Sequence, residues 1–399
     1  MNIKPLGKRD HRIDVLRALA LLTIFINHIP GNVLEPFTHK NFGLSDSAEA
    51  FVLLAGVASA FAYFPRFYAG AMALPLAKIA KRVVILYVAH LASLMVGLGI
   101  FCFALQRWGM PILDIPLNIN SIFAEPEKAL VGIPLLTQQI GYHNILPLYV
   151  CLLIFLPVLM IVARYFGLAA MLTTSVAIYA MAHIFGLNMP SYPSNGGWFF
   201  NPFTWQLIFG VGFFTGVRVL RGETPVPFYR PLWWLAFAYL VGACIYHRYN
   251  LYGSIPNVSW LPTNFQINEK PWVALPRLLH ILSLAYVIGH SRLIMSCLGR
   301  LSPEGILSRI GRNSLPVFWL GTALSVVGQV LLFADQPGPM EQIAFIAIGI
   351  LAQAGLAYLL DYLGGAARAK AKPVQVQAIA PAAVGSKATA PSDNGAVAV

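Results

Sequence analysis

The sequence predicts an all-α integral membrane protein, a helical bundle of about ten transmembrane helices with both termini in the cytoplasm. Hydrophobic residues make up 58% of the 399-residue chain and charged residues only 11%, and the mean hydropathy is +0.68. Soluble domains carry about 25% charged residues, so we expect lipid to solvate much of this apolar surface. Lys and Arg gather on one side of the predicted helices, which supports both the count and the orientation.

Ten apolar segments account for the predicted bundle. Several are short for a bilayer that needs about 20 residues, so we expect them to extend into their flanks. The segments are residues 15–29, 48–64, 83–105, 146–163, 168–185, 205–220, 232–246, 274–289, 315–333 and 343–363. An even number of spans places both ends of the chain on the same side of the membrane.

The formal net charge of +12 could indicate a nucleic-acid partner, but the placement of the charges argues against it. Basic residues such as Arg66, Lys81 and Arg164 fall on the predicted cytoplasmic side, whereas few, such as Lys40 and Arg107, fall on the other. This asymmetry is typical of membrane topology. We therefore predict a multi-pass protein of a bacterial inner membrane, in contact with lipid and without a nucleic-acid partner.

Two regions organise the chain. Residues 1–363 form the predicted transmembrane domain, and residues 364–399 lack helical periodicity and form a predicted disordered cytoplasmic tail. The four cysteines have no paired spacing, so neither a disulfide nor a metal site is expected. No phosphate-binding or dinucleotide-binding glycine motif is present, which argues against an ATP-driven pump or a nicotinamide enzyme. We expect no permanently bound cofactor.

The long connections lie on the predicted periplasmic side and are rich in aromatic, Pro, Asn and Gly residues. They cover residues 30–47, 106–142, 186–204 and 247–273. Trp and Tyr anchor helices at membrane interfaces, and the flat faces of sugars stack on the same side chains. Both explanations stay open residue by residue, but the loops as a group predict a periplasmic cavity.

Arg17 and His28 in the first segment are the strongest candidates for chemistry. They are eleven residues apart, which in a helix is ~16 Å and close to three turns, so they share one face. Ionisable groups are costly in a membrane and usually line a cavity or pathway. That face therefore carries a permanent cation at one end and a titratable base at the other. The alternative is that Arg17 reaches lipid phosphate and His28 only touches interfacial water.

Asp46 and Glu49 begin the second segment, on the side of the membrane where His28 ends. They are three residues apart and share one helix face. A carboxylate beside a histidine orients the ring and stabilises the imidazolium, so His28 with either of them would form a general base. Capping of the helix is the alternative role for Asp46.

Other polar residues are weaker candidates. Lys78, Lys81 and Arg82 open the third segment, where they could hold a phosphorylated donor or simply follow the positive-inside rule. His143 and Asn144 could line an acceptor entrance. Arg277 could meet a carboxylate on the transferred group or the acceptor, or it could pair with Asp46 or Glu49 of the second segment.

These segments resemble the acyltransferase-3 superfamily of integral-membrane acyltransferases and, within it, the OpgC family. The resembling segments are RDHRIDVLRALALLTIFINHI, SDSAEAFVLLAG, ILPLYV, FNPFTWQLIFGVG and IGRNSLPVFWLG. The resemblance implies transfer of succinyl groups from cytoplasmic succinyl-CoA, as co-substrate, to glucose hydroxyls of osmoregulated periplasmic glucans. It implies that Arg17 and His28 are essential, with His28 the base. Asn201, Trp205 and Gln206 match a family segment that we expect to position the glucan or the pantetheine arm of the donor.

The residues and the resemblance together predict a donor on Arg17, Lys78, Lys81 and Arg82 and a glucan hydroxyl activated by His28, with Asp46 or Glu49 as its partner. A covalent acyl-histidine intermediate is the mechanistic alternative. An O-acetyltransferase of another envelope glycan, or a transporter of a glycan or small anion without chemistry, are the alternative functions. An oligomer is compatible with the sequence.

Overall fold

The described part of the chain is mainly α-helical and has almost no strands, as predicted. This computed structural model describes residues 10–109, 119–266 and 268–370. Each of the ten predicted segments corresponds to one helix. These are α1 (His11–Asn27), α2 (Ser47–Tyr68), α3 (Ala73–Trp108), α6 (Ile145–Tyr165), α7 (Gly167–Phe185), α8 (Pro202–Leu220), α9 (Arg230–Arg248), α11 (Leu275–His290), α14 (Ser314–Ala334) and α15 (Pro339–Lys370). Helix α1 ends at Asn27, however, so that His28 is its C-cap and not a helical residue.

The connections contain short elements that the sequence analysis did not predict. Those on the predicted periplasmic side are the 3₁₀ helices η1 (Glu35–Phe37) and η2 (His39–Asn41), the helices α4 (Asn120–Ala124), α5 (Pro126–Gly132) and α10 (Thr263–Gln266), and the strands β1 (Pro190–Ser191) and β2 (Gly196–Gly197). The helices α12 (Arg292–Arg300) and α13 (Ile306–Arg312) lie between α11 and α14. Strands β1 and β2 pair antiparallel, with Pro190 opposite Gly197.

Within the described residues, seven helices are long and apolar enough to cross a membrane, or eight if α11 and α12, which meet at a bend of 72°, form one span. The membrane fold class is therefore confirmed, whereas the count of ten and the sides of the termini stay predictions. Helices α1 and α9 are not among the seven. Of the predicted tail, α15 covers residues up to Lys370, and residues 371–399 lie outside the described part.

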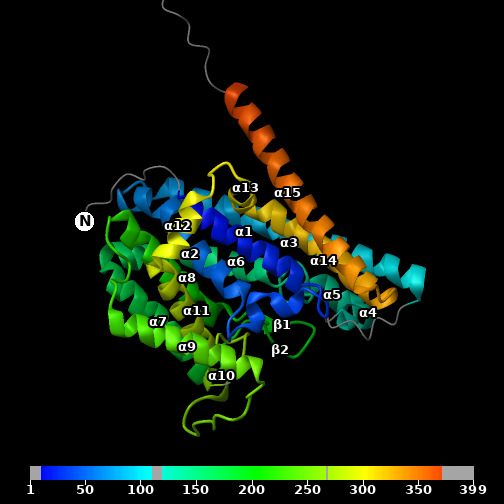
Figure 1. Ribbon diagram of the computed structural model, residues 1–399, viewed down its shortest axis with the longest axis horizontal. Helices are drawn as coiled ribbons and strands as arrows, with labels where there is room; N and C mark the ends of the chain where they lie inside the picture. The colour runs from blue at the N-terminus through cyan, green and yellow to red at the C-terminus, as the bar shows by residue number, and fades with distance from the viewer. Residues whose placement is uncertain (1–9, 110–118, 267, 371–399) are drawn as a thin grey trace, which may run out of the picture. The chain divides into compact units, whose positions relative to one another are not determined.

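Glycines bring α2 and α8 into very close contact (Figure 1). A Cβ atom on Gly56 would lie 2.1 Å from the carbonyl oxygen of Phe209, and one on Gly212 would lie 2.1 Å from that of Leu53. Small residues let helix backbones approach each other in a membrane, where packing replaces the hydrophobic effect as the source of association. Because α2 begins directly after Asp46, this contact also determines where that carboxylate lies.

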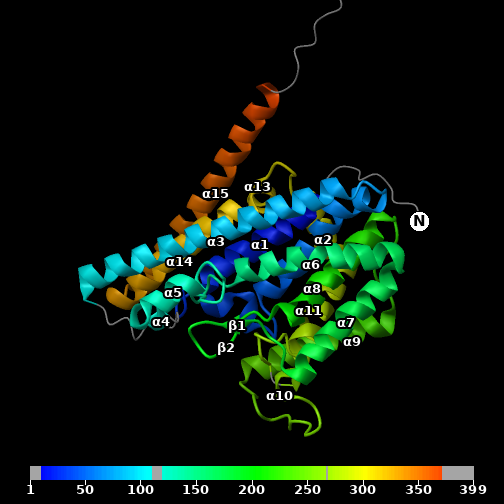
Figure 2. The ribbon, with the colours of Figure 1, turned by 180° about the vertical axis from the view of Figure 1, so that it is seen from behind.

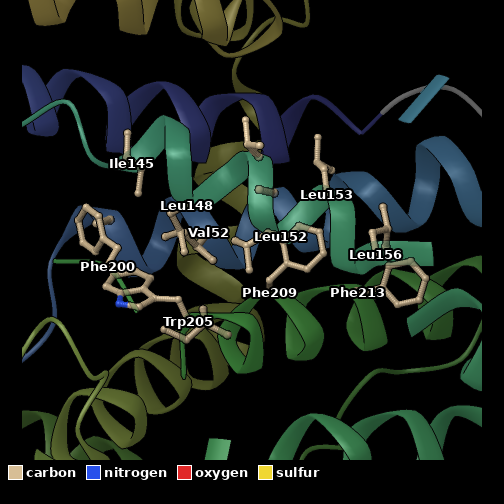
Figure 3. Packing of buried hydrophobic residues seen from close by; sticks show 14 of the residues in the cluster. Val52, Ile145, Leu148, Leu152, Leu153, Leu156, Phe200, Trp205, Phe209 and Phe213 are labelled. Atoms are coloured by element: carbon tan, nitrogen blue, oxygen red, sulfur yellow. The ribbon is translucent and has the colours of Figure 1, made fainter. Parts of the chain in front are cut away.

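The core beside this contact is formed by α6 and α8. Leu148, Leu152 and Leu156 of α6 pack toward Phe209 and Phe213 of α8, as Figure 3 shows. All five side chains are fully buried. Interdigitated aliphatic and aromatic side chains gain many small dispersion contacts, so this core provides a rigid support for the loops that follow α7 and precede α8.

Helix α1 packs against α2, α13 and α14 (Figures 1 and 2). Its first turn is capped by the Asp10 carboxylate, which accepts a hydrogen bond of 3.0 Å from the Arg12 backbone N–H. At the other end, the Asn32 side-chain amide donates to the carbonyl oxygens of Ile26 and Ile29 at 2.9 and 2.6 Å. These bonds satisfy carbonyls that a helix end leaves unpaired and hold the chain on either side of His28.

Candidate active site

His28 lies in the wall of a cavity of about 760 Å³. Polar side chains from several loops converge on this cavity, and aromatic rings form much of its surface. The lining includes Asn27, His28, Lys40, Asp46, Gln138, Gln139, Tyr142, Asn144, Asn188, Trp198, Phe199, Phe200, Lys270, Trp272, Ile145 and Phe318. We call it the His28 cavity.

Arg17 lies in the wall of a second, smaller cavity of about 210 Å³, which we call the Arg17 cavity. Three arginines line it: Arg17 from α1, Arg82 from α3 and Arg312 from the end of α13. Tyr63, Tyr149 and the aliphatic side chains of α2 and α6 complete the wall. An arginine-rich cavity of this kind favours a negatively charged ligand.

Two side chains belong to the walls of both cavities. Ile145, at the start of α6, and Phe318, on α14, line the His28 cavity on one side and the Arg17 cavity on the other. Their exposed fractions are 7% and 6%. The cavities are therefore neighbours along α1, with a thin hydrophobic partition between them.

The imidazole of His28 makes no hydrogen bond to a carboxylate in the described part of the chain. Its Nδ1 is buried and has no hydrogen-bond partner among the described residues, and its ring lies 4.7 Å from the ring of Tyr142, centroid to centroid. The Gln329 side-chain amide donates to the His28 carbonyl oxygen, which fixes the backbone. A ring nitrogen that the protein leaves unpaired is available to a ligand.

The predicted pairing of His28 with Asp46 or Glu49 does not occur among the described residues, because both carboxylates bind cations. Asp46 lies 2.6 Å from the Lys270 ammonium and 3.6 Å from the Arg277 guanidinium. Glu49 is 0% exposed and pairs with Arg277 at 2.6 Å. Burial alone raises the pKa of Asp46, but Lys270 and Arg277 outweigh it and hold that pKa below its usual range. Asp46 is therefore an ionised carboxylate in the cavity wall.

Asp46 also caps α2, as its alternative role predicts. Its carboxylate accepts from the Ala48 backbone N–H at 2.8 Å, and the Glu49 carboxylate accepts from the Asp46 backbone N–H at 3.0 Å. This reciprocal arrangement is a capping box. Glu49 does not line the His28 cavity, so its ion pair with Arg277 is structural.

Comparison with known protein families decides the identity of the chain. The sequence model of the family described as OpgC protein matches residues 9–364. The chain belongs to the OpgC family. No curated protein and no solved structure gave a match. Membership in the OpgC family indicates a multi-pass membrane acyltransferase that modifies glucans, whereas the wider acyltransferase-3 relationship stays a prediction.

The predicted donor residues of this OpgC family member are only partly brought together. Arg17 donates to the Asp14 carboxylate at 3.2 Å and to the Gly311 carbonyl at 3.1 Å. Arg82 lines the Arg17 cavity and makes no hydrogen bond or ion pair with the residues that the structure describes. Lys78 and Lys81 are exposed on α3 and are not part of the cavity wall.

Arg312 also lines the Arg17 cavity and was missed by the sequence analysis. It pairs with Asp361 at 2.8 Å and with Glu304 at 3.2 Å. The sequence offered one signal, a basic residue just before an apolar segment. Nothing in the sequence showed that α13 returns to α1, where a Cβ on Gly311 would lie 1.9 Å from the Asp14 carbonyl oxygen.

The predicted acceptor residues of the OpgC chain divide in the same way. Asn144 lines the His28 cavity, whereas His143 is 2% exposed and lies outside its wall. Arg277 is also absent from the wall and pairs with the carboxylates, which is the alternative role that its position suggested. Of these three predicted residues, only Asn144 lines the His28 cavity.

Three further predicted acceptor residues do not line the His28 cavity: Asn201, Trp205 and Gln206. They make hydrogen bonds inside the protein instead. All three are at most 2% exposed. Asn201 caps α8 and donates to the Leu187 carbonyl at 2.7 Å. The Gln206 amide donates to the Ser175 carbonyl at 2.7 Å. The indole N–H of Trp205 donates to the Pro271 carbonyl at 3.2 Å. The bonds of Asn201 and Trp205 hold the loops at Leu187 and Pro271, whereas the bond of Gln206 joins α8 to α7.

The aromatic residues that line the His28 cavity were anticipated only as a class. Trp198, Phe200 and Trp272 come from the two aromatic loops that predicted a cavity, but the sequence could not single them out. Lys270 was not considered. Among the described residues, no group of three or more His, Cys, Asp or Glu side chains is placed to hold a metal ion.

Proposed function

We propose that the chain transfers succinyl groups from cytoplasmic succinyl-CoA to glucose hydroxyls of a periplasmic glucan across a bacterial inner membrane. One observation carries this proposal: an arginine-lined cavity and a histidine-lined cavity lie next to each other along α1 and share Ile145 and Phe318. Two substrates that approach from opposite sides of the membrane would meet at this partition.

The Arg17 cavity suits a phosphate-bearing donor. Guanidinium groups bind phosphate through paired, charge-assisted hydrogen bonds. Arg82 has no protein partner in the described part of the chain, so a phosphate would not have to displace one. The narrow pantetheine arm of CoA would then reach past Phe318 toward His28, while the bulky nucleotide stays at the arginines.

The His28 cavity suits a sugar acceptor. It is more than three times the volume of the Arg17 cavity, at about 760 against 210 Å³. Trp198 and Trp272 offer flat faces for a pyranose ring, and Gln138 and Asn188 offer amide donors and acceptors for its hydroxyls. Aromatic faces and amide groups of this kind suit the binding of an uncharged glycan.

The chemistry needs one base and no permanent cofactor. The His28 imidazole takes the proton from a glucose hydroxyl as the oxygen attacks the thioester carbon. The new C–O ester bond forms, the C–S bond breaks, and the imidazolium returns the proton to the CoA thiolate. Asp46 stays ionised and, through Lys270 and Arg277, keeps the charge around the base balanced.

A label-transfer assay tests the proposal. Purified protein in nanodiscs is incubated with radiolabelled succinyl-CoA and neutral periplasmic glucan, and the glucan is separated and counted. We expect label on the glucan that mild alkali releases, as it does from an ester. Label from acetyl-CoA but not from succinyl-CoA would show that the donor is wrong. If no acyl-CoA is consumed, the enzyme is excluded and transport of a glycan or anion becomes the function to test.

A further inference from the structure

Lys270 is held rigidly in the wall of the His28 cavity. The residue after it, Pro271, has a carbonyl oxygen that accepts from the Asn201 backbone N–H at 3.1 Å and from the Trp205 indole at 3.2 Å. Two residues further on, the Val273 carbonyl accepts from the Tyr179 hydroxyl at 2.7 Å. Three buried groups of α7 and α8 thus anchor a loop that would otherwise be free to move.

The Lys270 ammonium has donors to spare. An ammonium carries three N–H bonds, and Asp46, at 2.6 Å, is the one carboxylate that pairs with it among the described residues. The nitrogen also lies 5.5 Å from the centre of the Phe200 ring, which lines the same cavity. With a side chain 29% exposed, Lys270 remains accessible from the cavity.

Asp46 can share Lys270 with a ligand because it has a second cation. Arg277 lies 3.6 Å from the Asp46 carboxylate. If Lys270 turned part of its hydrogen bonding to a bound carboxylate, Asp46 would still face a guanidinium. Leaving a buried carboxylate unpaired is strongly unfavourable, so this second partner is what makes the sharing possible.

Lys40, the other lysine in the cavity wall, lacks this freedom. It pairs with Glu35, and no other cation of the described residues pairs with that carboxylate. A ligand that drew Lys40 away would leave Glu35 without a counter-charge. Arg277 is likewise committed, because it pairs with Glu49 and does not line the cavity.

We infer that Lys270 binds a carboxylate at the far end of the transferred acyl group and so selects a dicarboxylic acyl donor. The inference rests on the proposed function and specifies which side chain of the cavity recognises the acyl group of the donor. A succinyl group ends in a carboxylate, whereas a butyryl group of the same length ends in a methyl. The succinyl carboxylate gains a charge-assisted hydrogen bond to Lys270. The butyryl methyl group cannot accept a hydrogen bond from the ammonium.

Lys270→Gln tests this role with two donors of equal length. Initial rates of transfer to glucan are measured with succinyl-CoA and with butyryl-CoA, in nanodiscs. We expect kcat/KM for succinyl-CoA to fall about 10- to 100-fold, since a hydrogen bond to a charged group is lost, while kcat/KM for butyryl-CoA changes less than about threefold. Lys270→Arg keeps the charge and should keep the preference. Lys40→Gln is the matched control and should leave the ratio of the two donors at the wild-type value.

Several outcomes would overturn the inference. An unchanged ratio of the two donors in Lys270→Gln excludes a role in selection, and an equal loss of both shows that the lysine is structural. A shifted ratio in Lys40→Gln would assign the role to the other lysine. If the wild type uses both donors equally well, the protein does not recognise the terminal carboxylate of the acyl group. Only the failure of the wild type to transfer either acyl group would count against the proposed function itself.

Discussion

His28→Gln is expected to lower kcat for succinyl transfer by about 10²- to 10⁴-fold, the usual contribution of a general base. Glutamine fills a similar volume and offers a hydrogen bond but cannot take up a proton. The contacts that hold the site are spared, because Gln329 binds the His28 main-chain carbonyl and Asn32 binds its neighbours. Rates are measured in nanodiscs over a range of succinyl-CoA concentrations.

His247→Gln is the matched control for this substitution. His247 lies near the end of α9 and outside both cavities, so its replacement should leave the rate within about twofold of the wild type, as surface changes usually do. A His28→Gln protein that retained a tenth or more of the wild-type kcat would exclude His28 as the base. Labelled wild-type protein trapped after a single turnover without glucan would instead favour the acyl-histidine intermediate.

Phe318→Trp is expected to lower kcat/KM for acyl-CoA by more than tenfold, on the order of the 1–3 kcal/mol that overpacking costs. The Phe318 side chain separates the two cavities, so a larger indole would fill the space through which the donor must pass. The side chains expected to bind the sugar, such as Trp198 and Gln138, are other residues of the His28 cavity, so we expect the KM for glucan to stay near the wild-type value. The measurement is the initial rate against the concentration of each substrate in turn.

Phe333→Trp on the same helix controls for the added bulk. Phe333 is 40% exposed near the end of α14 and belongs to neither cavity, so it should tolerate an indole. If Phe318→Trp worked as well as this control, the donor would not pass between the two cavities. A route through the partition would then be untenable.

The sequence predicted the helices well because each is a local property of the chain. Apolar runs of helical length identified the ten long helices of the described residues. The spacing of Arg17 and His28 predicted a shared helix face, whereas in the structure His28 is the C-cap of α1, directly after its last helical residue. The structure puts each in the wall of a cavity along that helix. Short elements such as η1, η2 and α10 depend on loop packing and have no such periodicity.

The pairing of charges could not be predicted, because the partners are far apart in the sequence. Asp46 and Glu49 were assigned to His28 since all three end at the same side of the membrane. Their actual partners, Lys270 and Arg277, lie more than 200 residues later in the sequence. An ion pair of a buried carboxylate with a cation is favoured over a contact with a neutral imidazole, but only a fold can bring that cation into reach.

The same limit applies to the segment that contains Asn201 and Trp205. Its polar and aromatic residues were expected to touch the glucan. In the structure they hold the loop that carries Lys270 and Trp272. Residue type alone does not distinguish a side chain that contacts a ligand from one that supports the contacting loop.

The sidedness of the reaction is the most direct test of the account. Neutral glucan is trapped inside proteoliposomes that carry the protein, labelled succinyl-CoA is added outside, and the lumenal glucan is recovered and counted. The account predicts labelled glucan inside intact vesicles and none with His28→Gln, because donor and acceptor reach His28 from opposite sides. Label that forms only when both substrates are on the same side would contradict it.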